Sequence, residues 1–298
     1  MTTLHTPLGT TLDTPLGTSS GTLLREASRM PEGLEIEVRN RHFDLASKLG
    51  TDWLDNDPFK TAFFNSMSIS FPIGEKSFID SVKAFDNAIT DSKLKAEMKS
   101  FYGQESVHRR EHQNFNEMLC AERGYNLEKL ELPYVKRVAL GKKRASAKMI
   151  LASTAGAEHL TAIMAAKLLQ GWLLGNADTQ IKELWLWHAT EELEHKSVAY
   201  DVYTQVGGRF KMRKTMMRLT TFYFLFDALL NAMRMLSHDK QLWKWRTIKS
   251  GCQFLLGKEG IIRSLWPEYK TYFKEDFHPW NNDNRELLEN WEHLLEPS

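Results

Sequence analysis

The sequence predicts an all-α protein organised around a four-helix bundle, and three observations predict this fold. Apolar residues recur at intervals of three to four over most of the chain beyond residue 30, and no convincing run alternates as a strand would. Glycines and capping residues divide this pattern into long segments with short connections. Such segments favour a bundle. We assign the bundle to 31–208 and a C-terminal helical extension, packed on the bundle, to 209–298.

The first 30 residues are expected to form a disordered tail. They repeat the stretch TPLGT at 6–10 and 14–18 and are rich in Thr, Gly, Pro and Ser, so burial would not offset the entropy lost on ordering. They lack the basic and continuous apolar regions of a signal peptide. The chain has 2 cysteines, which exclude a disulfide framework and fit a reducing compartment. We therefore expect a cytoplasmic protein.

Pro72 and Gly124 mark the limits of the first two predicted bundle helices. Pro72 suits a first helical turn, and the stretch PIGEKSFIDSVKAFDNAI that it opens has apolar residues at helical spacing. Thr90 or Asp91 can cap a second helix. This helix runs to Gly124, a residue type that commonly follows a helix C-terminus.

The third and fourth helices follow a loop predicted around 125–133. The third, roughly 134–170, is unusually rich in small residues. Asp178 can cap the fourth helix, which ends at Gly207-Gly208. In the third helix, small side chains would leave space for a substrate or allow a close helix crossing; they are Ala152, Ser153, Ala155, Gly156 and Ala157.

The extension at 209–298 begins with a basic stretch, RFKMRKTMMR, followed by the apolar run LTTFYFLFDALLNAM. The run is too short to span a membrane and contains Asp227. A helix buried against the bundle is one interpretation, and peripheral contact with a membrane through 209–233 is the other. The whole chain balances 39 Lys and Arg against 38 Asp and Glu, so charge gives no indication of a nucleic-acid partner.

The stretch HATEELEH at 188–195 concentrates groups that bind metals. On a helix, Glu192 and His195 share a face because they are three residues apart, and His188 lies on that face one turn earlier. The Glu-x-x-His spacing recurs at Glu105–His108, on the second predicted helix. It also occurs at Glu275–His278, where the following proline argues against a helix and indicates a chance match.

Single glutamates occur on the other two helices, Glu75 on the first and Glu158 on the third. Bundles that hold two metal ions take one Glu from each of two helices and one Glu-x-x-His pair from each of the others. Glu75 precedes Glu105, and Glu158 precedes Glu192, by roughly 30 residues, enough for a chain rising about 1.5 Å per residue to turn and return to the same depth. The longer interval between Glu105 and Glu158 permits a crossover. The order and spacing therefore predict a site for two metals.

These motifs resemble those of known proteins. The region from about 70 to 205 is similar to the ferritin-like di-iron carboxylate superfamily. The stretches FPIGEKSF, GQESVHRREH and WHATEELEHKS, with EDFHPW near the end, resemble signatures of a bacterial family of predicted metal-dependent hydrolases. The resemblance implies a ferritin-like four-helix bundle whose metal ligands are Glu75, Glu105, His108, Glu158, Glu192 and His195.

Several neighbouring residues are candidates for ligands or for groups that orient ligands. His188 resembles an additional iron ligand of arylamine N-oxygenases; otherwise it forms a hydrogen bond near the metals. His112 lies one turn after His108 and is either a ligand or a supporting group, whereas His159 points away from Glu158 and is expected to be supporting or structural. Tyr102 would face the metals or belong to the core.

Glu191 and Glu194 form a solvated or ion-pairing face in one interpretation, with Arg109, Arg110 and Lys196 as partners. In the other interpretation they orient the histidine ligands, which usually donate their second N–H. This second possibility makes Glu191 a candidate supporting residue.

Four carboxylates with two or three histidines suit iron or manganese better than zinc, which favours four tight ligands. Our leading hypothesis is therefore an oxygenase or oxidase with two iron ions, which uses O₂ and an electron donor to hydroxylate, desaturate or N-oxygenate a small organic substrate. One alternative is a metal-dependent hydrolase, in which the metal pair lowers the pKa of a bridging water. Another is a non-enzymatic iron-binding bundle. A homodimer is a further expectation.

Overall fold

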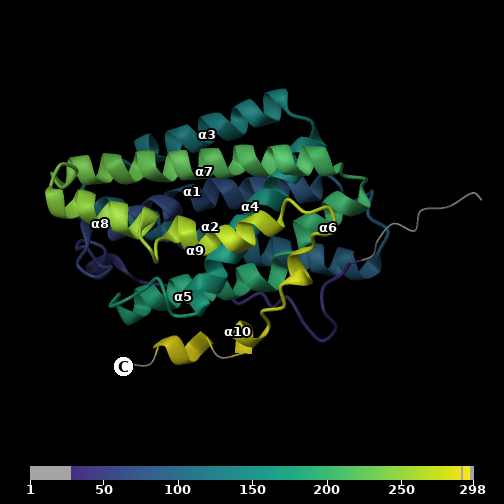
Figure 1. The fold of residues 1–298 in the computed structure, drawn as a ribbon, viewed down its shortest axis with the longest axis horizontal. Coiled ribbons are helices and arrows are strands. Elements are labelled where there is room, and N and C mark those ends of the chain that lie inside the picture. Colours follow the sequence, from purple (N-terminus) through teal and green to yellow (C-terminus); the bar gives the residue numbers. More distant parts are fainter. Residues whose placement is uncertain (1–27, 290, 296–298) are drawn as a thin grey trace, which may run out of the picture.

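The computed structural model describes residues 28–289 and 291–295, and helices and their connections account for all of them (Figure 1). The prediction of an all-α fold is confirmed. Most of the predicted tail, residues 1–27, lies outside the described residues. Its last part does not: the Ser28 hydroxyl donates a hydrogen bond to Glu97 over 2.6 Å, and Met30 is buried. The placed chain thus begins before residue 31.

Four long helices make up the bundle: α1 (Pro58–Lys83), α2 (Ser92–Arg123), α4 (Ala147–Leu169) and α5 (Thr179–His195). Helix α1 packs along α2, and α4 packs along α5. The fourth predicted helix is interrupted at Lys196-Ser197, after which the short α6 (Val198–Gln205) follows. The bundle prediction is confirmed, and the four expected glutamates lie on these four helices.

Helix α1 starts at Pro58, well before the predicted start at Pro72, so that prediction is wrong. Asp57 caps the helix by accepting hydrogen bonds from two backbone N–H groups of the first turn. Pro72 lies inside the helix and has no N–H to donate to the carbonyl of Ser68. The side-chain amide of Asn116, on α2, donates to that carbonyl over 3.0 Å. A neighbouring helix thus satisfies the acceptor that the proline leaves free.

The predicted caps of α2 are confirmed: Asp91 accepts from the backbone N–H of Leu94, and Gly124 has φ 68°. The predicted loop at 125–133 and the single helix at 134–170 are wrong. Asn126 caps an additional helix, α3 (Leu127–Arg144), and Ser146 caps α4. These two capping residues place α3 within the long interval between the second and third bundle helices.

An outer layer covers α1 and α4 on one side of the bundle (Figure 1). It comprises α3, α7 (Phe210–His238), α8 (Trp245–Leu256) and α9 (Ile261–Thr271). Helix α7 approaches α4 closely because Gly156 has no side chain; a Cβ there would lie 3.3 Å from the backbone of Met217. The remaining elements are short: η1 (Ala46–Lys48), η2 (Pro279–Asn281), α10 (Glu286–Glu289) and η3 (Trp291–Leu295).

The core consists of two apolar clusters. Phe64, Phe115 and Trp187 belong to one, and Val82 and Phe101 to the other. On α1 and α2, the predicted ligands lie between the segments that supply these clusters. Within the described residues, only α4 is long and apolar enough to cross a membrane, but 72% of that stretch is buried, as expected of a core helix.

Candidate metal centre

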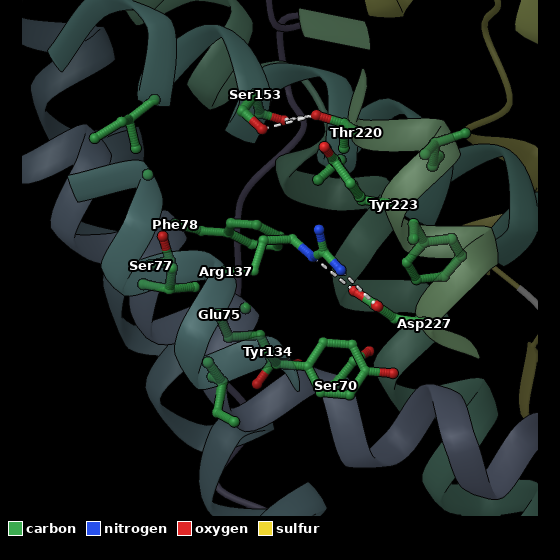
Figure 2. A pocket seen from close by; sticks show the side chains of 18 of the residues that line it. Ser70, Glu75, Ser77, Phe78, Tyr134, Arg137, Ser153, Thr220, Tyr223 and Asp227 are labelled. Carbon is green, nitrogen blue, oxygen red and sulfur yellow. Dashed lines mark hydrogen bonds and ion pairs between the residues drawn. The ribbon is translucent and has the colours of Figure 1, made fainter. Parts of the chain in front are cut away.

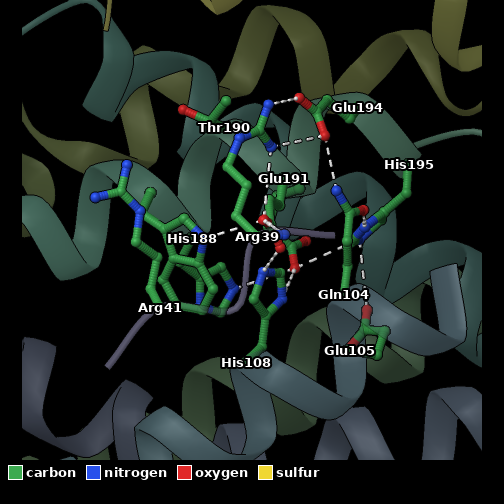
Figure 3. A network of polar contacts seen from close by, with 12 residues as sticks. Arg39, Arg41, Gln104, Glu105, His108, His188, Thr190, Glu191, Glu194 and His195 are labelled. Carbon is green, nitrogen blue, oxygen red and sulfur yellow. Dashed lines mark hydrogen bonds and ion pairs between the residues drawn. The ribbon is translucent and has the colours of Figure 1, made fainter. Parts of the chain in front are cut away.

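Four carboxylates and three imidazoles meet in the interior of the bundle. None of these residues is more than 5% exposed. They comprise Glu75 from α1, Glu105 and His108 from α2, Glu158 from α4, and His188, Glu192 and His195 from α5. Figure 3 shows four of these residues, Glu105, His108, His188 and His195, with the polar network around them. The structure therefore brings together all the predicted ligands, including His188.

The ligand atoms form two groups. Glu75, His108 and His188 make one and Glu105, Glu192 and His195 the other, with the candidate ligand atoms of each group within 4.8 Å of one another. Glu192 also connects the groups, because its Oε1 lies 3.1 Å from His188 Nε2 and 3.5 Å from His195 Nε2. Two cations with one carboxylate between them fit this arrangement.

Glu158 joins the second group through His195, whose Nε2 lies 3.2 Å from a Glu158 oxygen and 3.4 Å from a Glu105 oxygen. We call Glu75, His108 and His188 the first half of the centre, and Glu105, Glu158 and His195 the second half. Glu192 is shared.

Unpaired polar atoms are the main evidence that this cluster holds metal. Both carboxylate oxygens of Glu75, Glu105 and Glu158 are buried without a hydrogen-bond partner among the described residues. So are both ring nitrogens of His108 and Nε2 of His195. Buried carboxylates without partners are strongly unfavourable, and metal ions are the usual compensation. The donor set therefore fits two divalent cations.

The pKa values of the carboxyl groups also indicate that the cluster has more buried negative charge than the protein's own cations compensate. Burial, together with Glu192 and Glu158, raises the pKa of Glu75 well above its usual range. Burial and the same two neighbours raise the pKa of Glu105, and burial raises the pKa of Glu158 to about 7. Burial acts in the same direction on Glu192, but His195 beside it lowers the pKa overall. Without cations, the cluster retains protons that metal binding would release.

Glu191 orients His108. Its Oε2 lies 2.9 Å from His108 Nε2, and its Oε1 accepts from the indole of Trp187 and the backbone N–H of Arg39. This contact is an ion-pair distance without hydrogen-bond geometry, and the other ring nitrogen, Nδ1, lies 3.7 Å from the shared Glu192 and faces the centre. Glu191 is buried, so the interpretation as a solvated face is wrong; its ion pair with Arg39, 3.5 Å away, and its place beside His108 fit the ion-pairing and the orienting interpretations.

A charged network orients His195. Its Nδ1 lies 2.8 Å from Gln104 Oε1 and donates to it, so Nε2 faces the centre. Although burial lowers the pKa of His195, Glu192 and Glu158 raise it well above its usual range, so Nε2 holds a proton that a cation would replace. Gln104 donates to Glu194 over 2.7 Å, and Glu194 accepts two hydrogen bonds from the Arg39 guanidinium. Glu194 is buried, so the solvated interpretation is wrong for it too, whereas the expected ion pairing is present. Its cation comes from the segment before α1, not from the expected partners.

A neutral chain of hydrogen bonds orients His188. Asn116 donates to a backbone carbonyl, so its Oδ1 accepts from the Ser68 hydroxyl over 2.7 Å. The Ser68 oxygen then accepts from His112 Nδ1, 2.9 Å away, which leaves a lone pair on His112 Nε2. That lone pair accepts from His188 Nδ1 over 2.7 Å. His188 Nε2 is thereby left as a lone pair directed at Glu192, a pairing that requires a cation or proton between them.

A family model described as predicted metal-dependent hydrolase matches residues 37–283. The chain belongs to this family. No curated protein and no solved structure matches it. The matched region contains all seven candidate ligands and Arg39, and the family resemblance predicted from the motifs is confirmed. The family description supports the hydrolase alternative better than the leading oxygenase hypothesis.

Two candidate supporting residues, Tyr102 and His159, lie away from the centre. The Tyr102 hydroxyl donates to Asp86 over 2.6 Å, and its ring packs against the apolar cluster that contains Phe101, so the interpretation as a core residue fits and the one that faces the metals does not. His159 packs between the rings of Tyr272 and Phe277, 4.9 and 5.1 Å away, and burial lowers its pKa to about 3. His278 pairs with Asp201 over 2.8 Å, consistent with a chance Glu-x-x-His match.

A cavity of about 550 Å³ leads from the surface to the metal-ligand cluster (Figure 2). It lies between α1, α3, α4 and α7, and Glu75, His188 and Glu192 form part of its wall. Most of its remaining lining is apolar: Phe71, Ile73, Phe78, Val138, Leu160 and Phe224. Of the small residues on α4, Ser153 and Ala157 line the cavity, whereas Gly156 packs against α7.

One ion pair lies in the cavity wall. Arg137 donates two hydrogen bonds to Asp227, over 2.8 and 2.7 Å, and its guanidinium lies 3.9 Å from the ring centre of Tyr223 (Figure 2). Asp227, which argued against a membrane span in the sequence, is thus paired and buried. The pair gives this predominantly apolar cavity a charged, fixed polar position apart from the metal centre, and a hydrogen bond between Ser153 and Thr220 gives it a neutral one.

Proposed function

We propose that this chain is a metal-dependent hydrolase whose two-metal centre acts on a substrate with a sizeable apolar part. One observation carries the proposal: the unpaired ligand cluster forms the wall of a predominantly apolar cavity. A metal site that no substrate could reach would only stabilise the fold. Here Glu75 and His188 border both the metals and the space where a substrate can lie.

Each half of the centre would hold one cation. Glu75, His108 and His188 would bind the first and Glu105, Glu158 and His195 the second, with Glu192 between them. Two divalent cations supply Lewis acidity and lower the pKa of a bound water to near neutrality. The protein fixes the nitrogen donors through Glu191, Gln104 and His112, so little reorganisation is needed on binding.

The cavity walls determine the substrate class. Aromatic and aliphatic side chains exclude water from the reacting group and favour an apolar chain or ring. The guanidinium of Arg137 is partly exposed and offers a contact for a polar or anionic substituent. An ester, amide or phosphoester with a long apolar substituent meets both conditions.

Oxygen-dependent oxidation is the second candidate function, and the donor set favours it. Four carboxylates and three imidazoles suit iron or manganese better than zinc. An apolar cavity also accommodates a substrate without a hydrolysable bond. This function would require O₂ and an electron donor, and it would agree with the proposed placement in the ferritin-like superfamily.

Metal-dependent turnover distinguishes the candidates. Metal-free protein would be loaded separately with Fe(II), Mn(II) and Zn(II) under anaerobic conditions and assayed with nitrophenyl esters and phosphoesters of increasing chain length. We expect metal-dependent hydrolysis without oxygen that improves with chain length. Oxygen uptake and new near-ultraviolet absorption only after Fe(II) loading, without hydrolysis, would favour the oxidase. Bound metal with neither activity would leave the non-enzymatic iron-binding bundle.

A further inference from the structure

Exposed aromatic and large aliphatic side chains concentrate on α7, α8, α9 and their connections. Trp243 and Trp245 are 85% and 75% exposed, and Phe222 and Leu256 are 60% and 62% exposed. Phe226 and Trp266 are also half exposed. Single exposed apolar residues are ordinary on a soluble protein, but a concentration on one set of helices indicates a contact surface.

The same segment carries a large excess of positive charge. Residues 209–274 contain 14 Lys and Arg but 4 Asp and Glu, whereas the whole chain is nearly balanced at 39 and 38. Three of the four acids are neutralised by ion pairs: Asp227 by Arg137, Asp239 by Arg123 and Glu268 by Lys167. Several exposed cations have no ion-pair partner among the described residues; they include Lys244, Arg246, Lys249, Lys258, Arg263 and Lys270.

The helices that carry these groups lie on one side of the molecule. Helix α7 packs on α1 and α4, α8 packs on α1, and α9 packs on α4, so their outer surfaces point away from the same side of the bundle (Figure 1). The cavity reaches this layer between α3 and α7, where Leu140, Lys142 and Tyr223 line it. We call the outer surface of α7, α8 and α9 the basic aromatic face.

We propose that the basic aromatic face docks on the surface of an anionic lipid bilayer. Tryptophan and phenylalanine side chains partition into the interfacial region of a bilayer, and lysine and arginine beside them are attracted to anionic headgroups. A second copy of this chain is a poorer occupant, because two-fold pairing of the face would bring its unpaired cations together. The sequence suggested membrane contact through 209–233; the structure extends the face to α8 and α9.

Docking would place the cavity entrance beside the bilayer. A lipid-like substrate with an apolar chain could then pass from the bilayer into the cavity and reach the metal centre. This consequence rests on the proposed function. Leu219 is exposed on α7 and lines the cavity, so the apolar surface and the cavity are continuous there. The docking itself does not depend on the reaction that the metals perform.

Vesicle flotation of the full-length, metal-loaded protein tests the proposal. Vesicles of phosphatidylcholine alone would be compared with vesicles that also contain about 30% phosphatidylglycerol, a content that sets a negative surface potential. We expect binding to the anionic vesicles, weak binding to the neutral ones, and release in high salt. No binding to anionic vesicles, or equal binding to both compositions, would overturn the proposal.

Two double variants and a matched control identify the surface. Trp243→Ala with Trp245→Ala, and Arg246→Glu with Lys249→Glu, should each weaken partitioning about tenfold or more. Lys95→Glu with Lys99→Glu, on the exposed side of α2, should leave it unchanged. Equal effects of the test and control charges, or a dimer dissociated by the tryptophan variant, would contradict membrane docking. Metal content and turnover of a soluble substrate, measured without vesicles, should be unchanged and report separately on the proposed function.

Discussion

The two halves of the metal centre differ in access and in what holds their histidines. Glu75 and His188, in the first half, line the cavity, whereas Glu105, Glu158 and His195, in the second half, do not. The difference separates two tasks within one cluster of ligands: the first half is placed to meet a substrate, and the second is enclosed by protein.

The groups behind the histidines differ in charge. His195 is held through Gln104 by Glu194 and Arg39, an ion pair joined by two hydrogen bonds. His188 is held by His112 and neutral groups behind it. Charged hydrogen-bond networks are stronger than neutral ones, so His195 should be held more firmly than His188; His108, the other imidazole of the first half, faces the Glu191 carboxylate. Substitutions in each half test this difference.

The largest effect is expected from Glu192→Ala, because Glu192 is the carboxylate that both halves share. Its removal takes a ligand from each cation and leaves His195 among fewer anions. We expect metal content to fall from near two to near zero per chain, and activity to fall by on the order of 100-fold or more. Elemental analysis measures the first and turnover the second. Glu183→Ala, on the same helix, is the control, and two metals retained in Glu192→Ala would disprove the shared role.

Loss of a histidine should affect the halves unequally. His195 is the single imidazole of the second half, so His195→Ala should leave at most one metal per chain. In His188→Ala, the first half retains His108 and Glu75. We therefore expect both metals to bind, but the affinity of the first-half site to fall roughly 10–100-fold. Titration of metal-free protein with Mn(II) measures both. His238→Ala, an exposed histidine on α7, should change neither; identical results for the two halves would remove the distinction between them.

The charged network should have the next largest effect. Gln104→Ala removes the acceptor for His195 Nδ1 and the donor to Glu194, while the ion pair of Glu194 with Arg39 stays. We expect a roughly tenfold weaker second-half site with the first half unaltered. Gln113→Ala on the same helix, where the side chain contacts Glu117 near solvent, is the control. If Gln104→Ala weakened metal binding in the first half instead, the network would be stabilising the whole bundle and not His195 in particular.

The ligand set could be predicted from sequence because its chemistry is local. Glu105 with His108, and Glu192 with His195, are three residues apart, and any helix through them puts each pair on one face. The similar intervals before Glu105 and Glu192 then follow from helix length. This prediction of the ligands requires only that each residue lies on a helix of roughly the right length. It therefore holds even though the predicted ends of several helices were wrong.

The groups that hold the ligands depend on contacts between distant segments, which no spacing rule shows. Arg39 precedes the bundle and reaches Glu194 across a sequence separation of 155 residues. Without that partner in view, Glu194 and Glu191 look like a solvated face. Gln104 was visible in the motif GQESVH beside Glu105, but its role depends on α5 lying opposite. The predicted helix start at Pro72 was wrong for the same reason: a side chain on α2, distant in sequence, compensates for the N–H that the proline lacks.

The smallest effect is expected where the neutral chain begins. Ser68→Ala leaves His112 Nδ1–H without its acceptor, a loss of about 1–3 kcal/mol unless the ring changes tautomer. The changed tautomer would place an N–H against His188 Nδ1 and move the proton of His188 to the nitrogen that faces the metals. Either outcome should weaken the first-half site, by about three- to tenfold, and leave the second half unaffected.

Ser66→Ala is the matched control for this variant, because Ser66 is equally buried on α1 but its hydroxyl donates to the carbonyl of Phe63 in its own helix. Both variants should lower the melting temperature by a few degrees. Only Ser68→Ala should alter Mn(II) affinity, so equal affinities in the two variants would show that His188 is oriented by its helix alone. Weaker Mn(II) binding in the first half would show instead that the neutral chain from Asn116 through Ser68 and His112 fixes the orientation of His188.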